Sequence, residues 1–270
     1  MSNQRYISDS LRKKKKKVKK IKIYLWAIFS FLCIVSFLYV LTIPAFQIQE
    51  VKVTGTMFVD KSEIEQKTNT LLDRKFLGFI PNRNIFLFSK HELEELLKQN
   101  PAIISAKIRK DFFHILTIDV KEHEKEMIYC TTLEKTECFY LNKDGFVYAP
   151  VKGFIIPEQE IIIYNEKEVK KLQDTFIQKE VYVDISLFVK NLARQEIKIK
   201  EVYIKADSTV EFVSWENTRF ITSIFDEYKK DFANLIALFE KQAITKEQLQ
   251  NIEYIDLRFG NKVFYKNKTN

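Results

Sequence analysis

The stretch IYLWAIFSFLCIVSFLYVLTI, residues 23–43, decides how this chain is organised. It holds twenty-one residues without a charge. At about 1.5 Å per residue, a helix of that length covers the roughly 30 Å hydrocarbon core of a bilayer. The apolar region of a signal peptide is usually shorter, and no small-x-small cleavage site follows this stretch. The sequence therefore predicts one uncleaved transmembrane helix.

Basic residues are concentrated on one side of this predicted span. Residues 1–22 hold ten Lys or Arg and one acid, whereas the other flank, from Pro44, has no base until Lys52. By the positive-inside rule, residues 1–22 form a basic cytoplasmic tail and everything after the span lies across the membrane. Contact of the tail with anionic lipid headgroups is an alternative to a role that only sets topology.

The same tail accounts for the positive charge of the whole chain. Ten bases and one acid give residues 1–22 a net charge of +9, so the total of +8 leaves −1 for residues 23–270. A basic pI of this origin does not indicate a nucleic-acid-binding protein, because the folded part is nearly neutral. The remaining length, with 14% aromatic residues and few Gly or Pro, is typical of well-packed globular structure and suggests two domains.

The first part after the span predicts a small α+β module. Asp60 with Glu63, and Ser89 with Glu92, resemble capping boxes that open two helices. Alternating apolar residues predict strands before and after them, and the first strand changes phase around Glu50. In chain order the predicted elements are a strand at 46–53, a helix after Asp60, a helix after Ser89 that Asn100-Pro101 ends, and strands at 104–109 and 116–121.

Residues 73–88 form a longer apolar connection that contains Gly78 and Pro81. We expect its phenylalanines to pack on the core as a flap. A membrane-adjacent or partner-binding role is the alternative, because exposed apolar patches usually mark contacts.

Three motifs resemble one protein family. They are F-x-I-x-x-V-x-V-x-G at residues 46–55, N-P-A-I-I-S-A at 100–106 and L-T-I-D-V-K-E at 116–122. Together with a basic tail and one span, they are similar to the bacterial cell-division family FtsQ/DivIB. The resemblance implies that residues 44–122 form a POTRA domain. The chain departs from the family pattern at three places. Phe112-Phe113 stands where the family usually has Trp-Pro, and Arg83 stands at a position that is often Gly. Lys125 stands near the position where a Pro commonly follows the Glu.

Residues 123–270 predict a strand-rich β-domain, which the resemblance also implies. Met127–Cys130 and Cys138–Leu141 indicate a hairpin, and Asn142–Gly145 turns into a third run. Further strands are predicted at 146–148, 155–156, 161–164, 197–205 and 210–215, with helices at 166–179, 185–194 (capped by Asp184) and 219–241. In the last helix, Ile224, Tyr228, Phe232, Leu235 and Phe239 form an inward stripe, with Glu227, Lys229, Lys230 and Asp231 outward.

Cys130 and Cys138 lie eight residues apart on opposing arms of the first hairpin, in what should be an oxidising compartment. A cross-strand disulfide is our hypothesis for this pair. Two reduced, partly buried thiols are the alternative. Metal binding is the weakest interpretation, because only His114 and His123 would be available to join the two thiols.

The end of the chain carries the family's closing signature. Residues 254–259 (YIDLRF) resemble Y-x-D-L-R-Y, and Gly260-Asn261 independently predicts a hairpin turn into KVFYK, residues 262–266. The resemblance implies that this edge receives a strand from the coiled-coil division protein FtsB, itself paired with FtsL. The implied partner-binding residues are Arg258, for a partner carboxylate, Phe259, as a buried anchor, and Val263, Phe264 and Tyr265. Ordinary strand core is the alternative for whichever of these side chains face inward.

Catalytic motifs are missing from the sequence. It contains no G-x-S-x-G, no phosphate-binding glycine loop and no H-E-x-x-H, and it has three histidines. We therefore expect a non-catalytic protein without cofactor, metal or small-molecule substrate. The family resemblance implies a divisome scaffold, held in the cell membrane at the division septum with other divisome membrane proteins as partners. The alternative is a membrane-anchored envelope enzyme or sensor that uses a POTRA-like adaptor domain.

Overall fold

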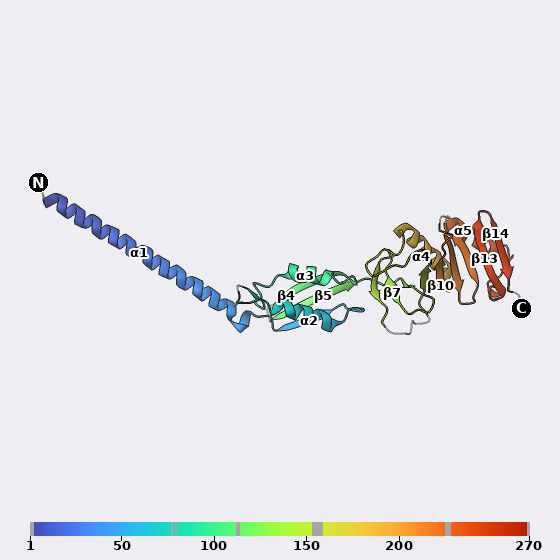
Figure 1. The fold of residues 1–270 in the computed structure, drawn as a ribbon, viewed down its shortest axis with the longest axis horizontal. Coiled ribbons are helices and arrows are strands. Elements are labelled where there is room, and N and C mark those ends of the chain that lie inside the picture. The colour runs from blue at the N-terminus through green and yellow to red at the C-terminus, as the bar shows by residue number, and fades with distance from the viewer. Residues whose placement is uncertain are drawn as a thin grey trace. The chain divides into compact units, whose positions relative to one another are not determined.

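A computed structural model describes residues 3–76, 78, 80–111, 114–152, 159–224 and 228–268. The chain falls into two compact units. The first comprises Met1–Leu97 with Ser105–Val120, and the second comprises Lys98–Ile104 with Lys121–Asn270. Most of a three-stranded sheet lies in the first unit and a nine-stranded sheet lies in the second (Figure 1). This mixed architecture confirms the predicted α+β class.

Helix α1 runs from Asn3 to Thr42. Its segment Lys19–Thr42, with a mean hydropathy of 2.3, is long and apolar enough to cross a membrane. The large apolar side chains along this segment are mostly exposed, as lipid-facing side chains must be. The helix also begins twenty residues before the predicted span, so the backbone of the basic tail continues the same helix.

Side chains of the first unit cap the C-terminal end of α1. Asn84 is buried and donates from Nδ2 to the carbonyl of Leu41 at 2.8 Å, and Gln47 donates from Nε2 to the carbonyl of Thr42 at 3.0 Å. A helix leaves its last four carbonyls without partners inside the helix, and these two bonds satisfy two of them. The end of the apolar helix is therefore tied directly to the domain that follows.

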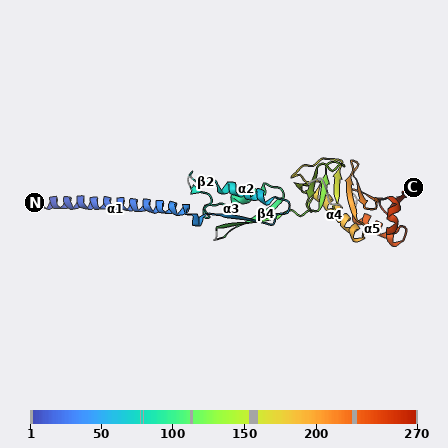
Figure 2. The same ribbon diagram turned by 90° about the horizontal axis from the view of Figure 1, so that it is seen from below.

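The three-stranded sheet has the order β1-β5-β4. Strand β1 (Glu50–Thr54) is parallel to β5 (Ile115–Glu122), and β4 (Ile103–Asp111) lies on the other side of β5. Helices α2 (Lys61–Leu72) and α3 (Lys90–Lys98) cover one face of this sheet (Figures 1 and 2), where alternate side chains of β5 are buried.

The geometry at Gly55 shows why the first family motif ends in glycine. It has a φ of +82°, and a Cβ at this position would lie 2.1 Å from the carbonyl oxygen of Val120 in β5. Only glycine allows this close approach of two backbone segments.

The nine-stranded sheet of the second unit has the order β14-β13-β12-β11-β10-β9-β6-β7-β8. Helices α4 (Lys179–Arg194) and α5 (Tyr228–Glu240) lie on one side of it (Figure 2). The core between helices and sheet is aromatic, with the rings of Phe188 and Phe212 4.7 Å apart. The strands are β6 (Met127–Cys130), β7 (Cys138–Leu141), β8 (Val147–Pro150), β9 (Ile162–Asn165), β10 (Ile199–Ile204), β11 (Thr209–Ser214), β12 (Arg219–Ser223), β13 (Ile252–Phe259) and β14 (Lys262–Asn267).

The strand predicted at residues 46–53 is wrong in its first half. Pro44–Phe46 form a 3-10 turn, Gln47 makes only an isolated bridge to Asn84, and β1 begins at Glu50. The phase change at Glu50 therefore marks the start of the strand and not a bulge within it.

Two helix predictions in the second unit are also wrong. No helix covers residues 166–178, and residues 173–176 of this segment bond instead to residues 145–147 at the start of β8. Helix α4 begins at Lys179 instead of after Asp184. The start of the predicted helix 219–241 is strand β12, and α5 begins only at Tyr228. Asp231, which we expected to face outward, is buried.

In the apolar connection 73–88, one phenylalanine is buried and another is exposed. It contains a short hairpin of β2 (Lys75–Phe76) and β3 (Ile80–Pro81). Phe88 is buried at 3% exposure, as expected of a core flap, whereas Phe86 is 69% exposed. The predicted strand 155–156 and the Phe112-Phe113 pair lie outside the described residues.

Candidate partner-binding edge

Strand β14 forms one edge of the nine-stranded sheet. It pairs antiparallel with β13, and the two strands are joined by a turn at Gly260-Asn261. The side chain of Asn234 in α5 holds this turn, because its Nδ2 donates to the carbonyl of Gly260 at 2.6 Å. Within the described chain β13 is the only strand paired with β14, so the outer side of β14 presents backbone groups without a strand partner.

The opposite edge of the sheet is covered by the chain itself at the start of β8. Val147 donates its N–H to the carbonyl of Asp174 at 3.0 Å and accepts from the N–H of Gln173 at 2.8 Å. A bridge between Phe146 and Thr175 continues this pairing. Covering an edge in this way blocks the addition of a foreign strand. Among the described residues, no strand pairs with the outer side of β14, which makes this edge the candidate for a partner strand.

Two of the five predicted site residues meet on the surface of this edge. Phe259 at the end of β13 and Phe264 in β14 are 53% and 50% exposed, and their rings stack edge to face with centroids 4.9 Å apart. The bulge between Asp256 and Phe259 changes the register of the hairpin and so lets these rings meet. The result is an exposed aromatic pair beside unpaired strand backbone.

The other residues predicted on β14 face differently. Val263 packs against the apolar core of the second unit. Tyr265, 47% exposed, lines a polar hollow together with Gln248, Asn267 and Lys268. Side chains alternate along a strand, so Phe264 lies on one face of the sheet and Val263 and Tyr265 lie on the other.

Arg258 has a partner within its own strand. Its Nη2 lies 2.6 Å from Oδ2 of Asp256, its Nε donates to Oδ1 at 2.9 Å, and its Nη1 donates to Oγ1 of Thr209 at 3.2 Å. Asp256 is 6% exposed, so this two-point ion pair balances a buried carboxylate. A partner carboxylate would therefore have to compete with Asp256 for the guanidinium.

The sequence analysis missed a charged row beside the aromatic pair. Glu253 in β13 accepts from Lys266 in β14 at 2.8 Å and from Arg219 in β12 at 2.9 Å. The hydrogen bond to Lys266 lowers the pKa of Glu253, and the bond to Glu253 raises the pKa of Lys266. The row joins three neighbouring strands, β12, β13 and β14. The sequence alone does not connect these residues, because they become neighbours only when the three strands pair.

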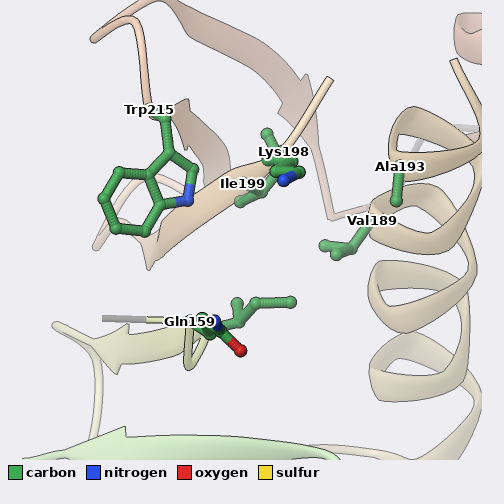
Figure 3. A pocket seen from close by; sticks show the side chains of 7 residues that line it. Gln159, Val189, Ala193, Lys198, Ile199 and Trp215 are labelled. Atoms are coloured by element: carbon green, nitrogen blue, oxygen red, sulfur yellow. The ribbon is translucent and has the colours of Figure 1, made fainter. Parts of the chain in front are cut away.

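A separate cavity of about 620 Å³ opens between α4 and β10 (Figure 3). Its described lining residues are Gln159, Ile161, Val189, Ala193, Lys198, Ile199 and Trp215. Lys198 is the one titratable side chain among them, so these residues include no acid–base pair and no activated nucleophile. Among the described residues there is also no cluster of three or more His, Cys, Asp or Glu that would hold a metal ion.

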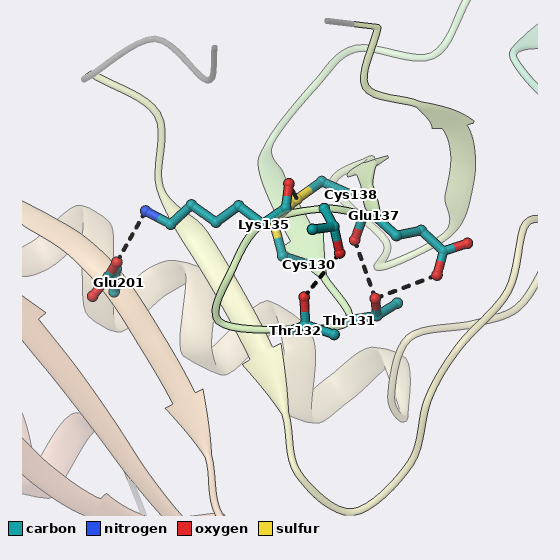
Figure 4. Close-up of a disulfide and its surroundings, with 8 residues drawn as sticks. Cys130, Thr131, Thr132, Lys135, Glu137, Cys138 and Glu201 are labelled. Atoms are coloured by element: carbon teal, nitrogen blue, oxygen red, sulfur yellow. Dashed lines mark hydrogen bonds and ion pairs between the residues drawn. A yellow bond between two sulfur atoms is a disulfide. The ribbon is translucent and has the colours of Figure 1, made fainter. Parts of the chain in front are cut away.

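Cys130 and Cys138 face each other at the end of the β6–β7 hairpin. They are register partners with Cα atoms 4.1 Å apart, and the structure joins them by a disulfide (Figure 4). Lys135 in the connecting turn lies 3.3 Å from Glu201 of β10 and ties the turn to the sheet.

The fold defines a class of protein, namely one with an apolar N-terminal helix long enough to cross a membrane, a small α+β domain of the POTRA type and a large β-domain. The family model described as "POTRA domain, FtsQ-type" matches residues 46–123. The chain is 24% identical over 274 residues to the cell division protein DivIB of Clostridium botulinum (strain Loch Maree / Type A3), covering 98% of this chain and 97% of that protein.

A DivIB from Clostridium botulinum strain Hall is 27% identical over 173 residues, covering 64% of this chain and 55% of that protein. These matches support membership of the FtsQ/DivIB family of bacterial cell-division proteins, in agreement with the motifs. They also support a role in cell division. Both relatives are named for division and not for a reaction, which fits the expectation of a non-catalytic protein.

Proposed function

We propose that this protein is a scaffold of the division septum that gathers other single-pass division proteins beside its own span. Its basic tail, residues 1–22, lies in the cytoplasm, and residues 23–43 cross the membrane. The POTRA domain at 44–122 and the β-domain at 123–270 lie outside. The charge asymmetry around the apolar helix supports this orientation.

The open edge at β14 is the observation that carries the proposal. A strand added there would gain main-chain hydrogen bonds from the unpaired side of β14, and its alternate side chains would read the surface that includes Phe259 and Phe264. The partner we propose is a division protein of the FtsB type, paired with FtsL, whose own span would bring it to the same membrane. The edge supplies affinity, and the aromatic pair supplies specificity.

The scaffold role is tested by depleting the protein in cells that carry a fluorescent fusion of it. We expect bands of the fusion at midcell and filamentous cells after depletion. A diffuse envelope signal together with normal division would contradict the proposal and would favour a different envelope function.

The binding edge is tested by co-purification with FtsB- and FtsL-type proteins. Deleting residues 261–270 removes β14, so we expect partner recruitment to be abolished while the POTRA domain stays folded. Retained recruitment would place the contact elsewhere on the protein. A single substitution that leaves β14 in place, described below, separates loss of the edge from loss of the fold.

A further inference from the structure

The loop formed by residues 82–88 presents an exposed aromatic side chain beside the end of α1. Phe86 is 69% exposed. Its ring lies 5.7 Å from that of Phe46, which ends the 3-10 turn Pro44–Phe46 directly after the helix. The two rings together form an apolar patch on the surface, and exposed apolar patches can mark contacts with a membrane or a partner. The question is what covers this pair.

The loop is held in place on both sides of Phe86. Oδ1 of Asn84 accepts from the N–H of Phe86 at 2.9 Å. Lys110 in β4 donates from Nζ to the carbonyls of Ile85 and Phe88 at 2.6 and 2.7 Å. These bonds fix the backbone of the loop, so the outward position of Phe86 belongs to an ordered loop.

The position of Asn84 sets the depth of the pair relative to a membrane. Asn84 donates to the carbonyl of Leu41, in the last turn of the apolar segment Lys19–Thr42. Two residues of chain reach at most about 7 Å, so the backbone of Phe86 lies within that distance of Asn84. The polar layer on each side of the hydrocarbon core is about 5–8 Å thick. Phe86 therefore lies at the level of the interface.

We propose that Phe86 and Phe46 form an interfacial aromatic pair that inserts into the lipid leaflet in which α1 ends. Its occupant is the bilayer itself, at the boundary between headgroups and acyl chains, where amphipathic segments bury aromatic and aliphatic side chains. The pair is continuous with the span, because both rings are connected to its last turn through Asn84 and the short turn at Pro44. The contact restrains the tilt of the POTRA domain on the membrane.

The depth of the pair can be measured by fluorescence quenching in the full chain. Trp26 and Trp215 are first replaced by Phe, and Phe86→Trp then supplies the only indole. The protein is reconstituted in phosphatidylcholine–phosphatidylglycerol vesicles whose acyl chains are brominated near the headgroup end. We expect several-fold quenching relative to unbrominated vesicles.

Met57→Trp in the same background is the matched control. Met57 is 82% exposed in the turn after β1, and the five residues of β1 carry this turn about 15 Å away from the end of the span. We expect no quenching for this variant. Equal fluorescence of both variants with and without bromine would overturn the proposal.

A second measurement needs no substitution. A lipid with a photoactivated carbene precursor in its acyl chain is cross-linked to the reconstituted wild-type protein, and modified peptides are identified by mass spectrometry. We expect adducts on the segment containing Phe86, in addition to α1, and none on the segment containing Met57. Labelling confined to α1 would show that lipid does not cover the pair.

Discussion

The side-chain amide of Asn84 donates to the carbonyl of Leu41, forty-three residues earlier in the chain, at 2.8 Å. The same side chain accepts the N–H of Phe86 at 2.9 Å, and Asn84 has no exposed surface. One residue thus fixes two backbone segments, the end of the apolar helix and the loop that lies against it.

Replacing Asn84 by Ala should loosen this joint. The substitution removes the partner of the Leu41 carbonyl and of the Phe86 N–H, and a buried polar group without a partner costs about 1–3 kcal/mol. We expect amide hydrogen exchange in residues 82–88 to accelerate by about 10–100-fold, because a tenfold change corresponds to about 1.4 kcal/mol. Exchange is measured on the full chain by mass spectrometry. Asn165→Ala, in the second unit, is the control, and unchanged exchange at 82–88 in Asn84→Ala would contradict the prediction.

Phe259→Ala should weaken binding of an FtsB-type partner strand by about 2 kcal/mol or more, because buried aromatic anchors dominate such interfaces. Phe264→Ala should also weaken partner binding. The double variant should lose less binding free energy than the sum of the two single variants, because the two rings touch. Affinity is measured by titration calorimetry. Leu133→Ala, an exposed residue in the β6–β7 turn, serves as the control. An unchanged affinity in folded Phe259→Ala would remove this residue from the site.

Arg258→Ala should lower the stability of the β-domain as its main effect, and not the affinity for a partner. It leaves the buried carboxylate of Asp256 without its two-point partner. Because the arginine side chain is about a third exposed, we expect a loss of about 1–3 kcal/mol of unfolding free energy, less than for a fully buried pair. Chemical denaturation of the β-domain measures this loss. Lys262→Ala, on the exposed side of β14, should leave stability unchanged. Reduced affinity at unaltered stability would instead assign Arg258 to the partner.

The cysteine pair predicts a difference between oxidised and reduced protein. Closing a loop of this length contributes about 2–3 kcal/mol to the free energy of unfolding. Cys138→Ser should therefore be less stable than the wild type under oxidising conditions and equal to it in reductant. With the pair oxidised, a maleimide should label only Cys33 of the denatured full chain before reduction, and all three cysteines afterwards. Labelling of Cys130 and Cys138 that reduction does not change would rule out the disulfide.

His123 should make the β-domain sensitive to mild acid. Burial lowers the pKa of His123, and the nearby Asp144 carboxylate opposes this effect. Its Nδ1 lies 2.9 Å from Nδ2 of Asn142, so the neutral ring accepts this bond, and protonation would remove the acceptor. The unfolded chain binds a proton near pH 6.5 while the folded chain resists it, so stability is full above pH 6.5 and falls as the pH drops towards the lowered pKa.

The comparison variant for this pH dependence is His123→Gln, which keeps an acceptor and does not titrate. Between pH 7.5 and 5.5 we expect the midpoint of thermal unfolding to fall more in the wild type than in the variant. Parallel curves would show that another group causes the acid sensitivity.

The parts of the fold that could be predicted are those in which local pattern and tertiary environment agree. The apolar helix, the α2 cap at Asp60 and the β10–β11 hairpin follow from uniform or strictly periodic patterns. The segment 166–178 has helical composition, but its residues 173–176 bond to residues 145–147 at the start of β8. Arg219–Ser223 is compatible by composition with the start of a helix and with a strand. In both cases a neighbouring strand, distant in sequence, decides the conformation.

The candidate site divides in the same way. The Gly260-Asn261 turn and the two strands beside it could be predicted, and the family motif indicated Phe259. The contact between Phe259 and Phe264 could not, because it depends on a bulge that the sequence does not mark. The intramolecular partner of Arg258 was missed because two residues of one strand share a face only once the strand and its burial are known.

The chain itself covers the two edges of the large sheet to different extents. Residues 173–176 bond to residues 145–147 at the β8 edge, whereas no described strand pairs with the outer side of β14. If the proposed strand addition takes place at β14, each copy of the protein would accept one partner strand there, in a one-to-one ratio.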